Sequence, residues 1–291
     1  MKKTVKRIIE NTLSTLSPEF ASKFWYYMCF NKRLDLKRPV TLNEKLMWLK
    51  LNDYWHNPVI TMCADKYRVR EFIKDNGCEG ILNELYGVWD KAEDINWDKL
   101  PQSFVLKCNH GCGYNILCPD KNKADESAVK EQLDEWMHTD FWKKRAEVQY
   151  QDIEKKIVCE AFLGNGESLA DYKIYCFNGR AEYILYCDER ETGNTKFYFF
   201  DRQWNMCPIN KGSKDAFGKV FVEKPEKLQE MLDYAEKLAK PFPFVRVDFY
   251  YTENRIIFGE LTFVPAAALD TARLPETDIM FGNMLDIDLK K

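Results

Sequence analysis

The chain has 291 residues and a formal net charge of −3; 45% of its residues are hydrophobic and 31% are charged. This balance is typical of an ordinary globular protein and does not favour nucleic-acid binding, which requires an excess of basic residues. The sequence holds no run of about 18 apolar residues, so we expect no membrane span. Its first residues lack the apolar core of a signal peptide, and we therefore expect a cytoplasmic location.

Ten cysteines are present, and most of them lie singly in apolar, strand-like runs. In a chain without a secretory signal, reduced and buried thiols are the expected state. Cys108, Cys112 and Cys118 cluster around His110, but their spacing lacks the paired C-x2-C units of structural zinc sites. The sequence therefore favours neither disulfides nor a zinc site.

Residues 1–40 contain two predicted helices, at 5–16 and 18–30, and we interpret the aromatic face of the second as core packing. Thr41 and Glu44 then have the spacing of a capping box. A third helix is therefore expected to begin at this point.

A further helix is predicted at 66–74, with Asp65 as its N-cap and Gly77 as its stop. Residues 82–89 follow as a strand or extended segment, with a turn expected at Gly87.

A glycine-rich turn follows the predicted strand 103–108. Lys107 lies near the end of this strand, and Gly111 and Gly113 lie in the turn. Glycines allow backbone N–H groups to converge on an anion, and Lys107 would add a positive charge. A simple tight turn explains the same residues, and no Walker sequence follows. His110 is open between an acid or phosphate contact and a group that caps the backbone.

The second half of the chain alternates short strands with tight turns, which indicates an antiparallel sheet. Polar, helical sequence at 120–150 precedes it, and a helix is expected at 225–240. The predicted strands lie at 156–163, 171–176, 181–188 and 196–200.

Two runs rich in β-branched and aromatic residues, 244–251 and 256–263, flank a polar turn and predict a hairpin. Asp248 and Glu260 each place a carboxylate among apolar neighbours, which is costly unless the carboxylate is paired or binds a cation. A Mg²⁺ ion that bridges both and a substrate phosphate would stabilise them. Alternatively, Asp248 pairs with Arg246 on the same strand face, and Glu260 lies at a wet strand end.

The order of these features resembles an ATP-grasp domain, and in detail the TupA-like ATP-grasp family. That family is named for a teichuronopeptide biosynthesis protein and is found in bacterial capsule and cell-surface polysaccharide loci. The motifs that carry the resemblance are Asn43-Glu44-Lys45-Leu46, Asp65-Lys66-Tyr67, Phe104-Val105-Leu106-Lys107, Asp171-Tyr172-Lys173, Arg246-Val247-Asp248-Phe249-Tyr250 and Gly259-Glu260-Leu261-Thr262.

The resemblance implies an α+β fold in which ATP lies between two α+β lobes. It covers the chain from about residue 40 to the C-terminus, so 1–40 would be a preceding helical segment and 41–291 the grasp domain. Within that domain the lobes would span about 41–100, 101–155 and 156–291.

The resemblance also assigns the nucleotide phosphates. Lys66 and Lys107 would be the two phosphate-binding lysines, and Gly111 and Gly113 would let the turn fold over the phosphates. Glu160 would lie at the edge of the adenine.

The resemblance also implies contacts to the purine and the ribose, and it leaves alternatives open for some of them. The backbone of Ala161 and Phe162 would read the purine. Glu167 would hold the ribose hydroxyls, with Asp171 as a rival for that role. Lys173 would either touch the nucleotide or pair with Asp171.

At the reaction centre, the resemblance implies that Asp248 and Glu260 hold Mg²⁺ and that Arg246 faces the reacting phosphoryl group. Many ATP-grasp enzymes have an asparagine where this chain has Thr262, so a second metal would be held differently there. Within the family a glycine usually follows the next proline, whereas this chain has Pro265-Ala266-Ala267-Ala268. That difference would reshape the acceptor pocket.

The implied activity is that of a carboxylate–amine ligase, in which ATP converts a carboxylate to an acyl phosphate that an amine then captures. The expected substrates are a sugar acid or polysaccharide precursor and an amino acid or peptide. Association with a membrane-bound polysaccharide assembly complex is also implied. A glycosyltransferase that uses a nucleotide sugar is the first alternative, although Asp286 and Asp288 read as a polar C-terminal turn. A non-catalytic nucleotide-binding scaffold is the second, supported by Thr262.

Overall fold

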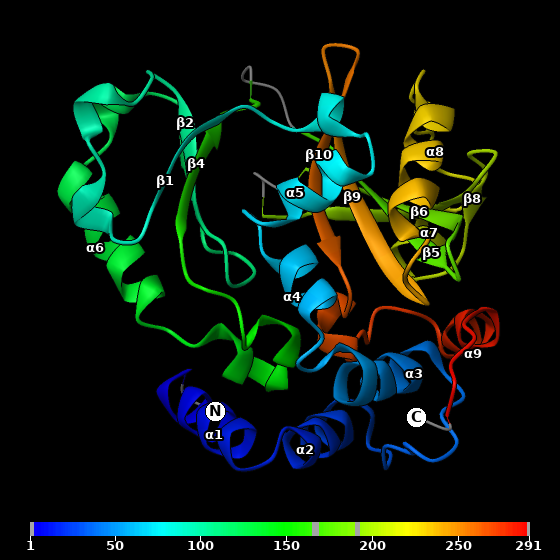
Figure 1. The fold of residues 1–291 in the computed structure, drawn as a ribbon. Helices are drawn as coiled ribbons and strands as arrows, with labels where there is room; N and C mark the ends of the chain where they lie inside the picture. Colours follow the sequence, from blue (N-terminus) through cyan, green and yellow to red (C-terminus); the bar gives the residue numbers. More distant parts are fainter. Residues whose placement is uncertain (1–2, 165–168, 190–192, 290–291) are drawn as a thin grey trace.

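The computed structural model describes residues 3–164, 169–189 and 193–289. Two antiparallel sheets dominate it, with strand orders β1-β4-β2-β3 (the small sheet) and β10-β9-β5-β6-β7-β8 (the large sheet). Figure 1 shows the two sheets on opposite sides of the molecule, with α1 and α2 below them in this view. The α+β architecture predicted from the sequence is confirmed. Among the described residues, none of the helices combines the length and apolarity needed to span a bilayer.

The N-terminal layer consists of α1 (Lys3–Leu16), α2 (Pro18–Phe30) and α3 (Leu42–Leu49). The predicted capping box is present: Thr41 Oγ1 accepts from the Glu44 N–H at 3.2 Å, and the Glu44 carboxylate accepts from the Thr41 N–H at 3.0 Å. The aromatic face of α2 is only partly core, because Trp25 and Tyr26 are buried whereas Phe20 is 57% exposed. The prediction that this whole face packs inside is therefore wrong at Phe20.

A π-helical turn (Lys50–Tyr54), α4 (Pro58–Ala64) and α5 (Val69–Asp75) connect this layer to the small sheet. The helix predicted from Lys66 begins only with α5. Asp65 nevertheless makes the hydrogen bonds of the predicted N-cap: its Oδ1 accepts from the N–H groups of Tyr67 at 2.7 Å and Arg68 at 3.1 Å, and its carbonyl accepts from the Val69 N–H at 3.0 Å. Gly77 follows α5 with a φ of +59°, and it confirms the predicted helix stop.

The small sheet contains β1 (Leu85–Trp89), β2 (Phe104–Cys108), β3 (Asn115–Cys118) and β4 (Ile157–Ala161). α6 (Glu126–Met137) packs on it, and 3-10 turns lie at Glu79–Ile81, Ala92–Asp94, Trp97–Lys99, Lys121–Lys123, Phe141–Ala146 and Val148–Tyr150. A small separate core that includes Phe104 and Leu133 lies between the sheet and α6. Gly87 lies inside β1 at a shift of register, so the turn predicted there is wrong.

The small sheet draws on all three of the expected lobes, since β1 comes from 41–100, β2 and β3 from 101–155, and β4 from 156–291. The lobe boundaries stay a prediction.

The large sheet contains β5 (Asp171–Phe177), β6 (Arg180–Asp188), β7 (Lys196–Asp201), β8 (Met206–Cys207), β9 (Phe244–Thr252) and β10 (Arg255–Thr262). The antiparallel sheet predicted for this half is confirmed. α8 (Leu228–Ala239) packs on β5, β6 and β9, and α7 (Lys211–Ala216) packs beside β7. After β10 come a 3-10 turn (Pro265–Ala268) and α9 (Pro275–Met284).

β9 and β10 form the predicted hairpin. They are joined through Glu253 and Asn254, whose φ values of 49° and 57° match a tight hairpin turn. A bulge makes Gly259 an extra residue and leaves Glu260 directly opposite Asp248. A Cβ at position 259 would lie 3.1 Å from the Asp248 carbonyl oxygen, so the position favours glycine. The bulge thus brings the two carboxylates of the hairpin together.

Candidate functional site

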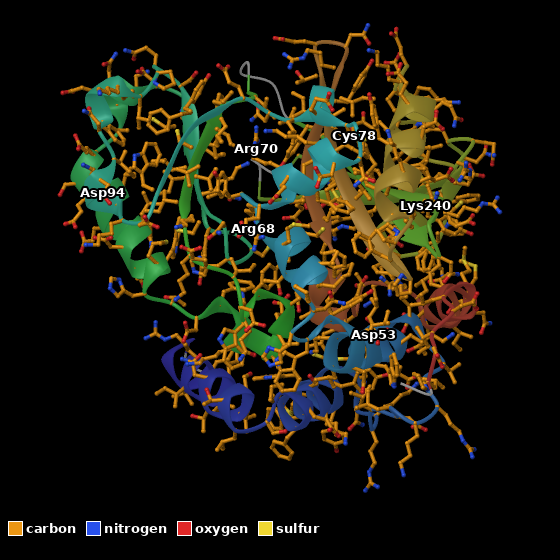
Figure 2. All side chains as sticks on the ribbon, in the orientation of Figure 1. Asp53, Arg68, Arg70, Cys78, Asp94 and Lys240 are labelled. Atoms are coloured by element: carbon orange, nitrogen blue, oxygen red, sulfur yellow. The ribbon has the colours of Figure 1, made fainter. Side chains whose placement is uncertain are left out.

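The first group of charged side chains, which we call the small-sheet cluster, consists of Arg70, Lys107 and Glu160. Lys107 Nζ on β2 donates to Glu160 Oε2 on β4 at 2.6 Å, and Arg70 Nη1 on α5 donates to Glu160 Oε1 at 3.1 Å. Arg70 Nη2 also donates to the Asn83 carbonyl at 2.7 Å. Figure 2 shows Arg70 in the region between the two sheets. With two cations and one carboxylate, this cluster has an excess of positive charge.

The second group, the large-sheet cluster, lies on β5, β9 and β10 and consists of Asp171, Lys173, Arg246, Asp248, Glu260 and Thr262. At its centre, Arg246 makes a two-pronged contact with Asp248, through Nε to Oδ1 and Nη2 to Oδ2, both at 2.7 Å. Lys173 Nζ donates to Asp248 Oδ2 at 2.6 Å and to Asp171 Oδ1 at 3.2 Å. Asp248 is only 2% exposed. The pairing of Asp248 with Arg246 and that of Lys173 with Asp171, both left open by the sequence, are therefore present.

Glu260 lies at the more solvent-exposed edge of the same cluster. Its Oε1 accepts from Thr262 Oγ1 at 2.8 Å and lies 3.5 Å from Arg246 Nη2, while its Oε2 lies 3.5 Å from Lys66 Nζ. Burial alone would raise the pKa of Glu260, but Lys66, Arg246 and Lys173 together lower it to about 2. The carboxylate therefore stays ionised at neutral pH.

The glycine turn is tied to the large-sheet cluster through Lys66, whose Nζ donates to the Gly111 carbonyl at 2.7 Å. Gly111 is required by packing, since a Cβ there would lie 2.6 Å from the ring of Phe141. Gly113 is favoured by its backbone, which has a φ of +80°. Lys66 thus holds one end of the turn within reach of Glu260.

His110 serves the backbone at the start of this turn. Its Nε2 lies 3.1 Å from the Trp136 carbonyl and 3.2 Å from the Thr139 carbonyl. Burial, reinforced by Lys155, lowers the pKa of His110 to about 4. No group of three His, Cys, Asp or Glu residues with metal-binding geometry occurs in the described ranges.

The residues expected to contact the adenine and the ribose have different surroundings in the structure. The Ala161 N–H donates to the Glu84 carbonyl at 3.0 Å and its carbonyl accepts from Asn83 Nδ2 at 2.8 Å, so its N–H is already used within the protein. Phe162 follows β4 and is partly exposed. Glu167 lies outside the described residues.

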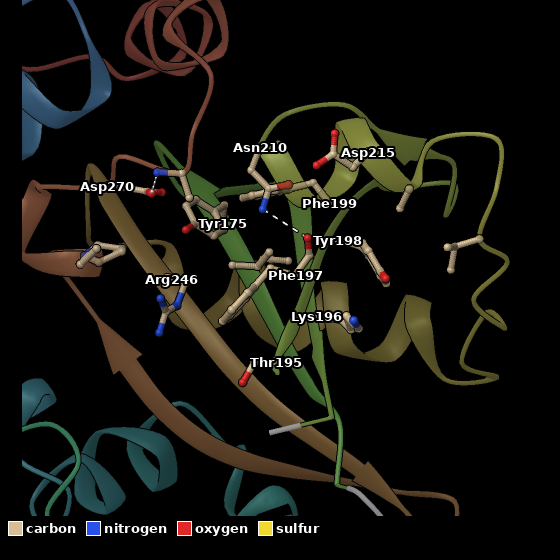
Figure 3. Close-up of a pocket in the computed structure, with 17 residues that line it drawn as sticks. Tyr175, Thr195, Lys196, Phe197, Tyr198, Phe199, Asn210, Asp215, Arg246 and Asp270 are labelled. Atoms are coloured by element: carbon tan, nitrogen blue, oxygen red, sulfur yellow. Dashed lines mark hydrogen bonds between the residues drawn. The ribbon is translucent and has the colours of Figure 1, made fainter. Parts of the chain in front are cut away.

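A cavity of about 600 Å³ adjoins the large-sheet cluster (Figure 3). Arg246 lines it and so belongs to both features; Tyr175, Phe197 and Phe199 supply an aromatic wall, and Asp215 adds a carboxylate. The Nε and Nη2 groups of Arg246 bond within the cluster, whereas its Nη1 has no hydrogen-bond partner in the part of the chain that the structure describes. Arg246 therefore keeps one edge of its guanidinium for a ligand.

Pro265 and Ala266 line the same cavity. Ala266, Ala267 and Ala268 all adopt left-handed φ values, of 52°, 57° and 56°. Residues with a Cβ avoid this conformation, at a cost of roughly 1–2 kcal/mol each. The wall next to Arg246 is therefore a strained backbone segment.

Oxygen donors at the large-sheet cluster fit a Mg²⁺ ion that is shared with a phosphate chain, because magnesium is bound through one or two carboxylates plus phosphate and water. The Glu260 side chain is 30% exposed and accessible to such an ion. Both oxygens of Asp248 already accept from Arg246 or Lys173, so this carboxylate would have to exchange one of those contacts. Thr262 offers a neutral hydroxyl beside Glu260.

The sequence reasoning assigned no role to Arg70, although this residue holds the carboxylate that Lys107 also contacts. No local pattern reports this role, because Arg70 meets Glu160 across 90 residues of sequence. Asp286 and Asp288, the acidic pair weighed for a glycosyltransferase, follow α9 and do not line the cavity.

The family model of the TupA-like ATP-grasp proteins matches residues 44–286, and the chain belongs to that family. The family resemblance and the ATP-grasp fold expected from the sequence are thus confirmed. None of the curated proteins matches the chain.

Several solved ligase structures are similar to the chain at low identity. D-alanine–D-alanine ligase from Bacillus anthracis, complexed with ATP, is 17% identical with a TM-score of 0.45, over 76% of this chain and 60% of that one. The Helicobacter pylori enzyme is 14% identical with a TM-score of 0.45, over 84% and 69%. L-amino acid ligase from Bacillus licheniformis is 12% identical with a TM-score of 0.43, over 81% and 48%. The chain thus spans about 60% of the length of the first of these ligases.

Proposed function

We propose that the protein is an ATP- and Mg²⁺-dependent carboxylate–amine ligase that acts through an acyl phosphate. The observation that carries the proposal is the position of Lys66, which contacts Gly111 of the glycine turn at 2.7 Å and Glu260 of the hairpin at 3.5 Å. Lys66 thus links the glycine turn of the small sheet to the carboxylate of the large sheet. Arg246 Nη2 lies 3.5 Å from the other oxygen of that carboxylate. Membership of an ATP-grasp family supports the same reading.

In this proposal the phosphates of ATP contact Lys66, Lys107 and the glycine turn, and the adenine lies near Glu160 and Phe162. Lys107 would release Glu160 to meet a phosphate, and Arg70 would remain to neutralise that carboxylate. Glu260, Asp248 and Thr262 would hold Mg²⁺, which supplies charge neutralisation at the transferred phosphoryl group when it is bound.

Arg246 is then placed to act on both reactants. A substrate carboxylate oxygen forms a bond to the γ-phosphorus while the bond from phosphorus to the bridging oxygen of ADP breaks. An amine nitrogen then bonds to the acyl carbon, phosphate leaves, and the nitrogen loses a proton to give the amide. The free Nη1 edge of Arg246 would orient the carboxylate for the first step and stabilise the negative charge that develops on the acyl oxygen when the amine adds.

The cavity beside Arg246 is the proposed binding site for the body of the carboxylate substrate. Its volume of about 600 Å³ lies within the range of roughly 300–1,000 Å³ typical of sites for drug-sized ligands. A single amino acid would leave much of it empty. The aromatic wall with Phe197 offers a face for a sugar ring, and this supports a sugar acid or polysaccharide precursor as the carboxylate substrate.

The amine would then come from an amino acid or peptide. On this basis we place the reaction in the biosynthesis of bacterial capsule or cell-surface polysaccharide, in the cytoplasm. Contact with a membrane-bound assembly complex would deliver the precursor.

The test combines nucleotide binding with turnover. A ligand at about 100 times its Kd stabilises the folded state by about 2.7 kcal/mol, so Mg-ATP and Mg-ADP should raise the melting temperature. Phosphate release from ATP should require both a uronic acid and an amino acid, and Glu260→Gln should abolish it. Arg246→Lys serves as the matched variant of Arg246, because it keeps the positive charge but loses the planar pair of N–H donors that contacts a carboxylate. A melting shift with nucleotide sugars alone would instead indicate a glycosyltransferase. Binding of Mg-ATP without turnover would indicate the nucleotide-binding scaffold, and no shift with any nucleotide would contradict the proposal.

A further inference from the structure

The first 40 residues, which we call the N-terminal basic segment, differ in charge from the rest of the chain. They hold nine lysines and arginines against three aspartates and glutamates, whereas the whole chain holds 43 against 46. The segment is therefore strongly positive and the remainder negative. An asymmetry of this kind is a signature of binding to an anionic surface.

The same segment exposes apolar side chains in helical stripes. Val5, Ile8 and Leu16 on α1 have the spacing of one helix face, as do Phe20, Tyr27 and Met28 on α2, and each is between 46% and 77% exposed. Figure 1 shows α1 and α2 at the outer edge of the molecule, in keeping with the exposure of both stripes.

α1 buries part of its apolar surface, since Ile9 packs against the main core, but it also carries a second apolar stripe on its exposed side. Here the buried side holds Glu10, at 7% exposure, and Ser14, at 0%, and Ser14 Oγ donates to the Lys143 carbonyl at 2.7 Å. Ile8 and Leu16 face outward instead. α1 thus presents an apolar stripe to the outside in addition to the side that packs against the protein.

We propose that α1 and α2 dock the protein on the surface of a membrane rich in anionic lipids. Basic side chains would contact the lipid headgroups while the apolar stripes enter the boundary between headgroups and acyl chains, as amphipathic helices do. The negative charge of the remaining chain would be repelled by the same surface, so only this side of the molecule would face it. The proposal does not rest on the ligase activity.

A second copy of the chain is the other occupant to consider. In a two-fold dimer the same surface of each subunit would meet, which would place two strongly basic segments against each other. An anionic lipid surface complements this charge, whereas a second copy repeats it.

The first experiment is flotation of the full chain with vesicles of phosphatidylcholine alone and of phosphatidylcholine mixed with phosphatidylglycerol. We expect the protein to float only with the anionic vesicles and to be released by high salt, because each basic residue near the surface contributes electrostatic attraction. Equal binding to both vesicle types, or to neither, would overturn the proposal.

Two variants separate the two contributions: Arg7→Glu with Lys23→Glu for charge, and Ile8→Ser with Leu16→Ser for the apolar stripe. Each pair should weaken binding at least about ten-fold without changing the melting temperature, since the substituted side chains are exposed. Phe221→Ser is the matched control, because Phe221 is 91% exposed but lies outside the N-terminal basic segment.

Three results would contradict the assignment. Unchanged binding of both variant pairs would show that α1 and α2 do not contact the lipid. Loss of binding in Phe221→Ser would move the contact to another surface. A dimer in sedimentation that either variant pair dissociates would show that this face binds a second copy of the chain.

Discussion

The small-sheet cluster and the large-sheet cluster are built from the same residue types but are balanced differently. In the small-sheet cluster, Lys107 and Arg70 share the single carboxylate of Glu160, and Lys107 keeps 22% of its side chain exposed. In the large-sheet cluster, Asp248 is nearly inaccessible and accepts from Arg246 on one side and Lys173 on the other.

This difference separates two tasks. A cluster with an excess cation near solvent can exchange one partner for an incoming anion at small cost. A buried cluster whose charges are paired with one another fixes the geometry of its members. It tolerates the loss of a partner poorly, because a charge is then left unpaired in a low dielectric. We therefore expect the small-sheet cluster to control ligand affinity and the large-sheet cluster to control stability and reaction geometry.

The largest effect on stability is expected for Asp248→Asn. The variant leaves Arg246 and Lys173 facing a neutral amide, and breaking a buried ion pair of this kind costs about 3–5 kcal/mol. Chemical denaturation would measure the loss, with Asp98→Asn as an exposed control. Glu160→Gln should cost clearly less, and equal losses for Asp248→Asn and Glu160→Gln would remove the distinction between the clusters.

Lys107→Met tests the opposite property. It should weaken ATP binding by roughly ten- to a hundred-fold, because a hydrogen bond to a charged group contributes about 1.5–3 kcal/mol, while the stability of the protein changes little. Calorimetric titration would measure the affinity. Lys91→Met is the control, since Lys91 is exposed and pairs only with Glu93 among the residues described. An ATP affinity equal to that of the wild type would show that Lys107 does not reach the nucleotide.

Protonation of His110 and of Glu260 should lower the stability of the protein in separate pH ranges. Folding lowers the pKa of His110 from 6.5 to about 4, so its neutral form is favoured and stability falls as the pH drops through this interval. Folding lowers the pKa of Glu260 from 4.5 to about 2, so its contribution is lost only as the pH falls from 4.5 towards 2.

Unfolding free energies measured across pH would resolve the two steps. His110→Gln should flatten the upper step and leave the lower one in place. Nuclear magnetic resonance can follow His110 directly, because the chain has three histidines in all. A midpoint for His110 near its ordinary value would contradict the burial argument.

The smallest effect is expected for Thr262→Val, which removes a hydroxyl that donates to Glu260 at 2.8 Å and accepts from Arg246 at 3.1 Å. The loss should be about 1 kcal/mol in the free energy of unfolding. Thr252→Val on the same hairpin is the matched control and should change little. If the two variants lose the same stability, the hydroxyl of Thr262 contributes nothing particular to the cluster.

The sequence predicted those parts of the fold and the site that depend on near neighbours. The β9–β10 hairpin follows from two β-rich runs around a polar turn, and the contact between Arg246 and Asp248 follows from their spacing on one strand face. Local departures from the general pattern were missed: regular helix begins at Val69 rather than Lys66, and Phe20 faces outward on α2.

Contacts between distant segments could not be predicted in the same way. Lys173 reaches Asp248 because β5 pairs with β9, and Glu160 meets Lys107 because β4 pairs with β2. Strand order decides both contacts, and no local pattern reports strand order. The family resemblance supplied candidates for these positions, but it did not indicate that Lys107 would bond to Glu160 or Lys173 to Asp248.

The left-handed alanines after Pro265 have a consequence for laboratory evolution of the protein. Ala266, Ala267 and Ala268 adopt a backbone conformation that glycine would adopt without strain, so Ala→Gly changes here should be tolerated or even raise stability. The segment borders the cavity at Ala266. A library confined to these positions would therefore vary the shape of the cavity while leaving the buried charges untouched, which makes it a starting point for testing whether this cavity sets substrate preference.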